Sequence, residues 1–79
     1  FVREINEYAS EMVFGYEFKA GPKTIWLLWT LDGYDHAITL SQVPSAVWDE
    51  LGSSILMDGT LLTIQGLKTY YVDWGTKSG

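Results

Sequence analysis

Turn-forming residues divide this 79-residue chain at short, regular intervals, and this spacing constrains the fold more than any other feature of the sequence. The turn signals are Gly21-Pro22, Asp32-Gly33, Pro44-Ser45, Gly52-Ser53, Asp58-Gly59 and Gly66. A spacing of about 8–12 residues, with alternating segments between the turns, is typical of all-β sandwiches and barrels. We therefore expect an all-β fold, namely an Ig-like antiparallel β-sandwich of seven or eight short strands.

The segments between the turns alternate in the way that half-buried strands require. Phe14, Tyr16 and Phe18 share one face of a segment, with Gly15 and Glu17 on the other face. The same alternation runs through residues 37–41, 62–65 and 70–74. Successive side chains of a strand point to opposite faces of a sheet, whereas a helix repeats every 3.6 residues, so these segments are predicted as strands.

Two further segments, 3–12 and 46–51, could form helices on their spacing alone. In the first, strand-forming residues stand at both ends, so we predict a short strand, a polar turn and a second strand. In the second, Val47-Trp48 precedes Asp49 and Gly52, which predicts a strand that enters a turn.

The composition excludes several classes of function. Ten acidic residues against five basic ones give a net charge of −5, which argues against nucleic acid and against an anionic membrane surface as partners. The longest purely apolar run, residues 25–29, is far too short to span a bilayer. Because the chain has no cysteine, disulfides and thiolate metal sites are impossible, and the compartment stays undetermined between secreted and cytoplasmic.

The length predicts a single domain covering residues 1–79, near the lower limit for a self-sufficient core. The chain opens at Phe1, without an initiator Met or a signal-peptide pattern. We therefore expect it to be a piece of a longer protein.

No group of residues indicates catalysis, a metal site or a cofactor. His36 is the single histidine, so a metal site would lack a second imidazole. Asp32 with Asp35, or Asp49 with Glu50, could pair as the carboxylates of a glycosidase, but carboxylates in turns more often shape the turn. We predict that this chain alone is not an enzyme and binds no cofactor.

One predicted strand, TIWLLWT, is apolar on both faces. Ile25, Leu27 and Trp29 share one face, and Trp26 and Leu28 share the other. A strand of this kind is usually central, yet a two-sheet sandwich covers only its inner face. We expect Trp29 to anchor the core on the first face, and the face with Trp26 and Leu28 to be buried against a neighbour.

The order of several motifs carries a resemblance to a known family. The motifs are Y-x-F at 16–18, L-W-T-L-D-G at 28–33, a strand ending in Leu at 37–40, V-x-D-x-x-G at 47–52, a G-x-L-x-h strand at 59–64 and a last strand at 68–72. In this order, across about residues 13–74, they resemble the C-terminal β-sandwich attached to many TIM-barrel glycoside hydrolases. The resemblance implies a non-catalytic accessory domain, since the catalytic carboxylates of those enzymes lie on the barrel, which needs about 250 residues.

The partner that the resemblance implies is the catalytic domain of the same polypeptide. The candidates for docking or ligand binding are Trp26, Leu28, Tyr34, Trp48, Tyr71 and Trp74. They would either bury an apolar face against the barrel and stabilise it, or form a platform on which sugar rings stack, as in a carbohydrate-binding module. A general protein-interaction module that uses the same patch is a third alternative.

Overall fold

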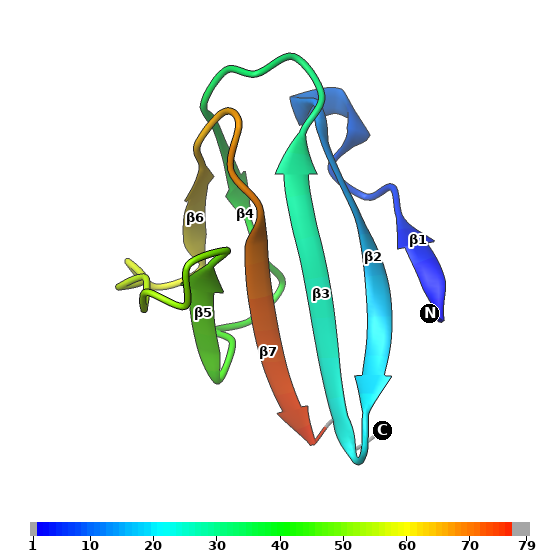
Figure 1. Cartoon of the computed structure of the whole chain (residues 1–79). Coiled ribbons are helices and arrows are strands. Elements are labelled where there is room, and N and C mark those ends of the chain that lie inside the picture. Colours follow the sequence, from blue (N-terminus) through cyan, green and yellow to red (C-terminus); the bar gives the residue numbers. More distant parts are fainter. Residues whose placement is uncertain (1, 77–79) are drawn as a thin grey trace.

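The structure is a computed structural model that describes residues 2–76; Phe1 and residues 77–79 of the predicted domain lie outside the described residues. The elements in chain order are β1 (Arg3–Ile5), the 3-10 turn η1 (Ala9–Glu11), β2 (Val13–Ala20), β3 (Lys23–Thr30), β4 (His36–Thr39), β5 (Ala46–Asp49), β6 (Leu61–Ile64) and β7 (Tyr70–Thr76). They form a five-stranded sheet in the order β1-β2-β3-β7-β5 and a two-stranded sheet, β4-β6 (Figure 1). The predicted all-β antiparallel sandwich is confirmed, with seven strands in the described part of the chain.

The β2-β3 hairpin is the frame of the larger sheet. Its strands pair along their whole length, from Val13 opposite Thr30 to Ala20 opposite Lys23. The chain reverses through a two-residue turn in which Gly21 has φ of 63°, a conformation that glycine adopts without steric cost. β1 then pairs with the free edge of β2, and β7 with the free edge of β3.

A single apolar core lies between the two sheets. Its buried residues are Ile5, Val13, Trp26, Leu28, Ile38, Leu40, Val47, Leu62, Ile64, Tyr70, Val72 and Trp74. The two-stranded sheet contributes Ile38, Leu62 and Ile64, which cover the inner face of the larger sheet. Each of these strands is apolar on its inner side, as their alternating sequences predict.

β3 faces the core with the side opposite to the one that we expected. Trp26 and Leu28 are buried, with 5% and 0% of their surface exposed. Ile25, Leu27 and Trp29 are half-buried on the outer face of the sheet. The prediction that Trp29 anchors the core was therefore wrong, and so was the prediction that Trp26 and Leu28 stay uncovered by this domain.

The strands beside β3 explain this orientation. Leu28 lies opposite Gly15 of β2, whose missing side chain leaves space for the leucine. Trp26 lies between Glu17 and Val72 in the two neighbouring strands. Because β3 itself is about equally apolar on both faces, the side that turns inward depends on these neighbours.

Glu17 is buried on the inner face, with 8% of its surface exposed, and has two partners there. The indole Nε1 of Trp26 donates a hydrogen bond of 2.9 Å to its Oε1 atom. The Nε atom of Arg3 lies 3.6 Å from the same oxygen, and the Arg3 guanidinium lies 5.8 Å from the Trp26 ring centroid. A buried carboxylate needs such partners to offset its desolvation, so Trp26 and Arg3 make an inward Glu17 tolerable.

Candidate functional site

The outer face of the five-stranded sheet carries a row of side chains that crosses all five strands. The strand register places Glu4 of β1 opposite Tyr16, Tyr16 opposite Leu27, Leu27 opposite Tyr71, and Tyr71 opposite Trp48 of β5. Residues directly opposite each other in antiparallel strands point to the same face of the sheet. The row therefore extends from one edge strand to the other.

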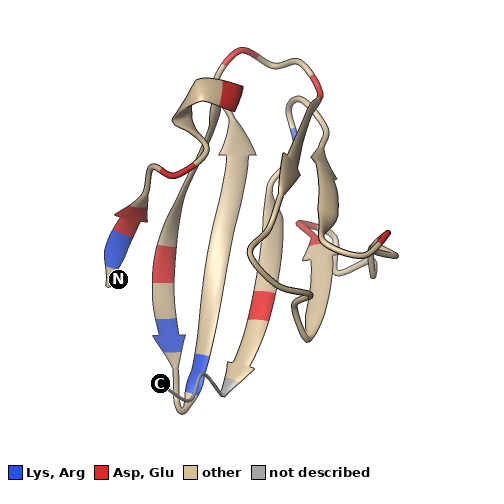
Figure 2. Ribbon diagram, turned by 180° about the vertical axis from the view of Figure 1, so that it is seen from behind, with Lys and Arg blue, Asp and Glu red and all other residues tan. Residues whose placement is uncertain are grey.

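Two further cross-strand pairs widen this row into a surface, since Phe14 lies opposite Trp29, and Phe18 opposite Ile25. We define the outer aromatic face as Phe14, Tyr16, Phe18, Ile25, Leu27, Trp29, Trp48 and Tyr71, all of which are half-buried. Figure 2 shows charged residues in loops, near strand ends and at mid-strand positions of β2 and β7, whereas β3 carries charge only at its first residue, Lys23. The strand register also places two carboxylates on this face, Glu4 opposite Tyr16 and Asp73 opposite Ile25. Within the described part of the chain no second sheet covers the outer aromatic face, because β4 and β6 lie on the other side.

The aromatic rings on this face form two separate groups. In the first, the ring of Tyr16 lies 5.3 Å from that of Trp29, at an interplanar angle of 46°, and 6.4 Å from that of Phe18. In the second, Trp48 and Tyr71 stack with centroids 5.9 Å apart and planes only 17° apart. The first group belongs to β2 and β3, and the second to β7 and β5, toward the opposite edge of the sheet.

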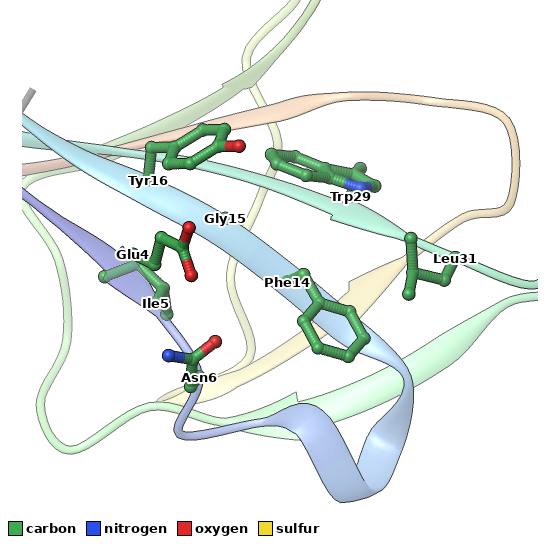
Figure 3. A pocket seen from close by; sticks show the side chains of 8 residues that line it. All are labelled: Glu4, Ile5, Asn6, Phe14, Gly15, Tyr16, Trp29 and Leu31. Atoms are coloured by element: carbon green, nitrogen blue, oxygen red, sulfur yellow. The ribbon is translucent and has the colours of Figure 1, made fainter.

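A hollow of about 160 Å³, which we call the β1 hollow, opens beside the first group (Figure 3). It is lined by Glu4, Ile5, Asn6, Phe14, Gly15, Tyr16, Trp29 and Leu31. In Figure 3 the side chains of Glu4 and Asn6 lie on the β1 side, those of Phe14 and Tyr16 project from β2, and the Trp29 ring lies beyond β2 on β3. The hollow thus combines aromatic walls with one carboxylate and one amide.

The six residues that we expected to dock or bind do not form one surface in the structure. Trp48 and Tyr71 lie together on the outer aromatic face. Tyr34 lies apart from them in the loop between β3 and β4, with 72% of its surface exposed.

The other three expected residues, Trp26, Leu28 and Trp74, are buried, and their assignment to an exposed surface is corrected. Trp74 is only 7% exposed, and its ring meets the Trp26 ring edge-on at 4.9 Å. These side chains fill the space between the two sheets, so none of them can meet a partner while the domain is folded.

The sequence analysis did not single out Tyr16, Trp29, Glu4 or Asn6 as possible binding residues. For Tyr16 and Trp29 a signal existed, because a two-residue turn at Gly21-Pro22 places both residues on one face of the hairpin. For Glu4 and Asn6 no signal existed, since their position follows from how β1 pairs with β2.

The carboxylates that we weighed for glycoside hydrolysis accept backbone hydrogen bonds in turns. Asp49 accepts from the N–H groups of Leu51 and Ser53, at 2.9 and 3.0 Å. Asp35 accepts from Gly66 at 2.9 Å, and Glu50 from Thr69 at 2.8 Å. These bonds give the carboxylates a role in shaping loops.

Asp32 holds the loop between β3 and β4 in the same way. Its Oδ1 atom accepts a hydrogen bond of 3.0 Å from the N–H of Tyr34, and its Oδ2 atom lies 2.8 Å from Nε2 of His36. The Tyr34 N–H, and secondly the His36 ring, lower the pKa of Asp32 below its ordinary value.

We expect this loop to loosen in acid before the sheet does. A carboxyl group with a lowered pKa stabilises the fold above its ordinary pKa of about 4, and this contribution is lost as the pH falls through the lowered value. An NMR titration should therefore give a midpoint below about 4 for the Asp32 carboxyl carbon, with the Tyr34 amide signal moving in parallel. A midpoint for Asp32 at or above the ordinary pKa would contradict this expectation, and so would a Tyr34 amide signal that does not shift with the Asp32 titration. Asp32→Asn should remove the parallel movement.

Among residues 2–76, no helix is long and apolar enough to cross a membrane. Within the same range, no three His, Asp or Glu side chains are grouped so that they could hold a metal ion. No family model, no curated protein and no solved structure matches the chain. Function must therefore be argued from the outer aromatic face and the β1 hollow themselves.

Proposed function

We propose that this chain is a non-catalytic accessory domain of a carbohydrate-active enzyme, and that the β7-β5 side of its outer aromatic face, around Trp48 and Tyr71, packs on and stabilises the catalytic barrel of a glycoside hydrolase. Two observations support the proposal. The order of sequence motifs resembles the C-terminal sandwich of such enzymes, and among residues 2–76 no second sheet covers the outer aromatic face.

The outer aromatic face is the observation that carries the proposal. Contiguous apolar surfaces of this kind mark interaction sites, and interface cores are enriched in Trp, Tyr and Phe. Each of its side chains is already half-buried by its neighbours, so little conformational freedom is lost when a partner covers it. Covering it gains free energy at about 25 cal/mol for each Å² of apolar surface removed from water.

The stacked pair Trp48 and Tyr71 is the proposed anchor of the interface. Its two rings restrain each other, and large, rigid aromatic side chains dominate the free energy of many interfaces. A barrel held at such an anchor loses some of its freedom to open, which raises the temperature at which the whole enzyme unfolds.

Serine at both anchor positions, 48 and 71, tests this function. In the polypeptide encoded by the complete open reading frame, we expect Trp48→Ser with Tyr71→Ser to lower the melting temperature by about 4 °C or more, because interface anchors contribute about 2 kcal/mol or more. In the isolated chain the same change should lower the melting temperature much less. The matched control is Tyr34→Ser, in an exposed loop, which should change neither protein. Equal losses in both proteins would show that the pair stabilises only its own domain.

A further inference from the structure

The β1 hollow presents polar groups that the domain itself does not use. Among the described residues, no hydrogen bond or ion pair engages the carboxylate of Glu4 or the side-chain amide of Asn6. Both residues are exposed, and both side chains line the hollow. They are therefore available to a ligand without breaking a contact within the fold.

The walls of the hollow are aromatic and set at an angle to each other. The rings of Tyr16 and Trp29 are 5.3 Å apart and tilted by 46°, and Phe14 continues the wall from the next outward position of β2. The volume of about 160 Å³ is close to that of an apolar protein cavity of about 150 Å³ that holds a benzene ring. The hollow thus has the size for one six-membered ring.

We infer that the β1 hollow binds a neutral pyranose ring of a glycan. A pyranose has a face of C–H groups, which packs on the rings of Tyr16 and Trp29, and a rim of hydroxyl groups. The ionised Glu4 carboxylate accepts hydrogen bonds from hydroxyls, whereas the Asn6 amide both donates and accepts them. The pair thus matches a ring whose hydroxyls do both.

Other ligand classes fit this combination less well. A cation would find the aromatic rings but only one carboxylate among the described lining residues, Glu4, whose exposed charge is screened by water. A phosphate would meet the like charge of Glu4, the one acidic or basic residue among the described residues that line the hollow. A wholly apolar ligand would desolvate the carboxylate without giving it a hydrogen bond.

This inference goes beyond the docking proposal and does not depend on it. The hollow lies at the β1 edge of the sheet, whereas Trp48 and Tyr71 lie on β5 and β7. With strands spaced by about 4.8 Å, the β1 and β5 edges are roughly 19 Å apart. A domain covering the β7-β5 side therefore leaves room for a sugar ring beside β1.

The test is an NMR titration of the 79-residue chain with xylotetraose, cellotetraose and mannotetraose, each up to about 20 mM, to detect millimolar or tighter binding. We expect at least one of them to shift the backbone signals of Glu4, Asn6 and Tyr16 and the indole N–H signal of Trp29, in a saturable way. The indole signal of Trp26, inside the core, should stay in place. Choline chloride and N-acetyl-arginine amide are titrated as cationic probes.

Glu4→Gln and Trp29→Ala should each weaken the binding about tenfold or more, since the first removes a charged acceptor and the second an aromatic wall. Glu4 is exposed, so its variant keeps the fold, and the backbone spectrum verifies this. Trp48→Ala is the matched aromatic control on the same face and should leave the affinity unchanged. The absence of shifts with all three sugars, unaltered binding in Glu4→Gln, or saturation by the cationic probes instead would each overturn the inference. None of these outcomes bears on the docking test at positions 48 and 71.

Discussion

Replacing Trp26 with alanine should lower the free energy of unfolding by about 3–5 kcal/mol, because it removes a large buried ring and leaves a cavity between the sheets. The ring is 5% exposed and lies 4.9 Å from the Trp74 ring and 6.3 Å from the Tyr8 ring. The change also takes a hydrogen-bond donor from the buried Glu17 carboxylate, which adds to the loss. Small domains have only about 5–15 kcal/mol of stability, so the variant should be close to unfolding at room temperature.

Urea unfolding followed by circular dichroism measures this loss, and Trp29→Ala is the matched control on the opposite face of the same strand. Because Trp29 is half-buried, its replacement should cost less than half as much. Trp26→Phe keeps most of the apolar volume and isolates the hydrogen bond to Glu17, so a result is obtained even if the alanine variant does not fold. A larger loss for Trp29→Ala than for Trp26→Ala would mean that the larger sheet turns its other face to the core.

The strands themselves could be predicted from the sequence, because their signals are local. The alternation around Tyr16, the turn at Gly21-Pro22 and the strand before Asp49 each depend on a few neighbouring residues. Segment 3–12 likewise forms a strand, β1, and a 3-10 turn, and the second strand, β2, begins directly after it at Val13. These local patterns were sufficient for the fold class and for the order of the elements.

The inward side of β3 could not be predicted, because its two faces are almost equally apolar. On β2 the usual rule would place Phe14, Tyr16 and Phe18 inside and Glu17 outside. The structure has the reverse arrangement, since Trp26 and Arg3 supply partners for an inward Glu17. The pattern of residues along one strand cannot predict that side chains of neighbouring strands will supply partners for a buried carboxylate.

The binding surface was only partly predictable for the same reason. Trp48 and Tyr71 were expected to bind or dock, but their stacking depends on the register of β5 against β7, which no local signal sets. The β1 hollow depends on β1 pairing with β2, which brings Glu4 opposite Tyr16. Long-range pairing, which sequence periodicity does not report, therefore assembles the candidate site.

Gly15→Ala is the second substitution for which we expect a large effect. It should lower the free energy of unfolding by about 3 kcal/mol or more. A Cβ atom there would overlap the backbone carbonyl oxygen of Leu27 and lie 2.7 Å from Cδ2 of Leu28. A side chain can change rotamer, but the Leu27 carbonyl belongs to the paired strand, so β2 and β3 would have to separate.

The Gly15→Ala loss should be measured beside that of Gly59→Ala, where φ is 61° and no atom lies within 4 Å of the added methyl group. In this control the free energy of unfolding should fall by only about 1–2 kcal/mol, the conformational cost of a non-glycine residue at positive φ. Leu28→Ala relieves only the contact with Cδ2 and should not rescue Gly15→Ala, because the Leu27 carbonyl remains in place. A Gly15→Ala loss below about 1 kcal/mol, or a clear rescue by Leu28→Ala, would show that the close approach of the two strands does not limit this position. Since Gly15 also lines the β1 hollow, separation of the strands there would displace Tyr16 and Trp29 and connect the packing of the hairpin to the shape of the proposed sugar site.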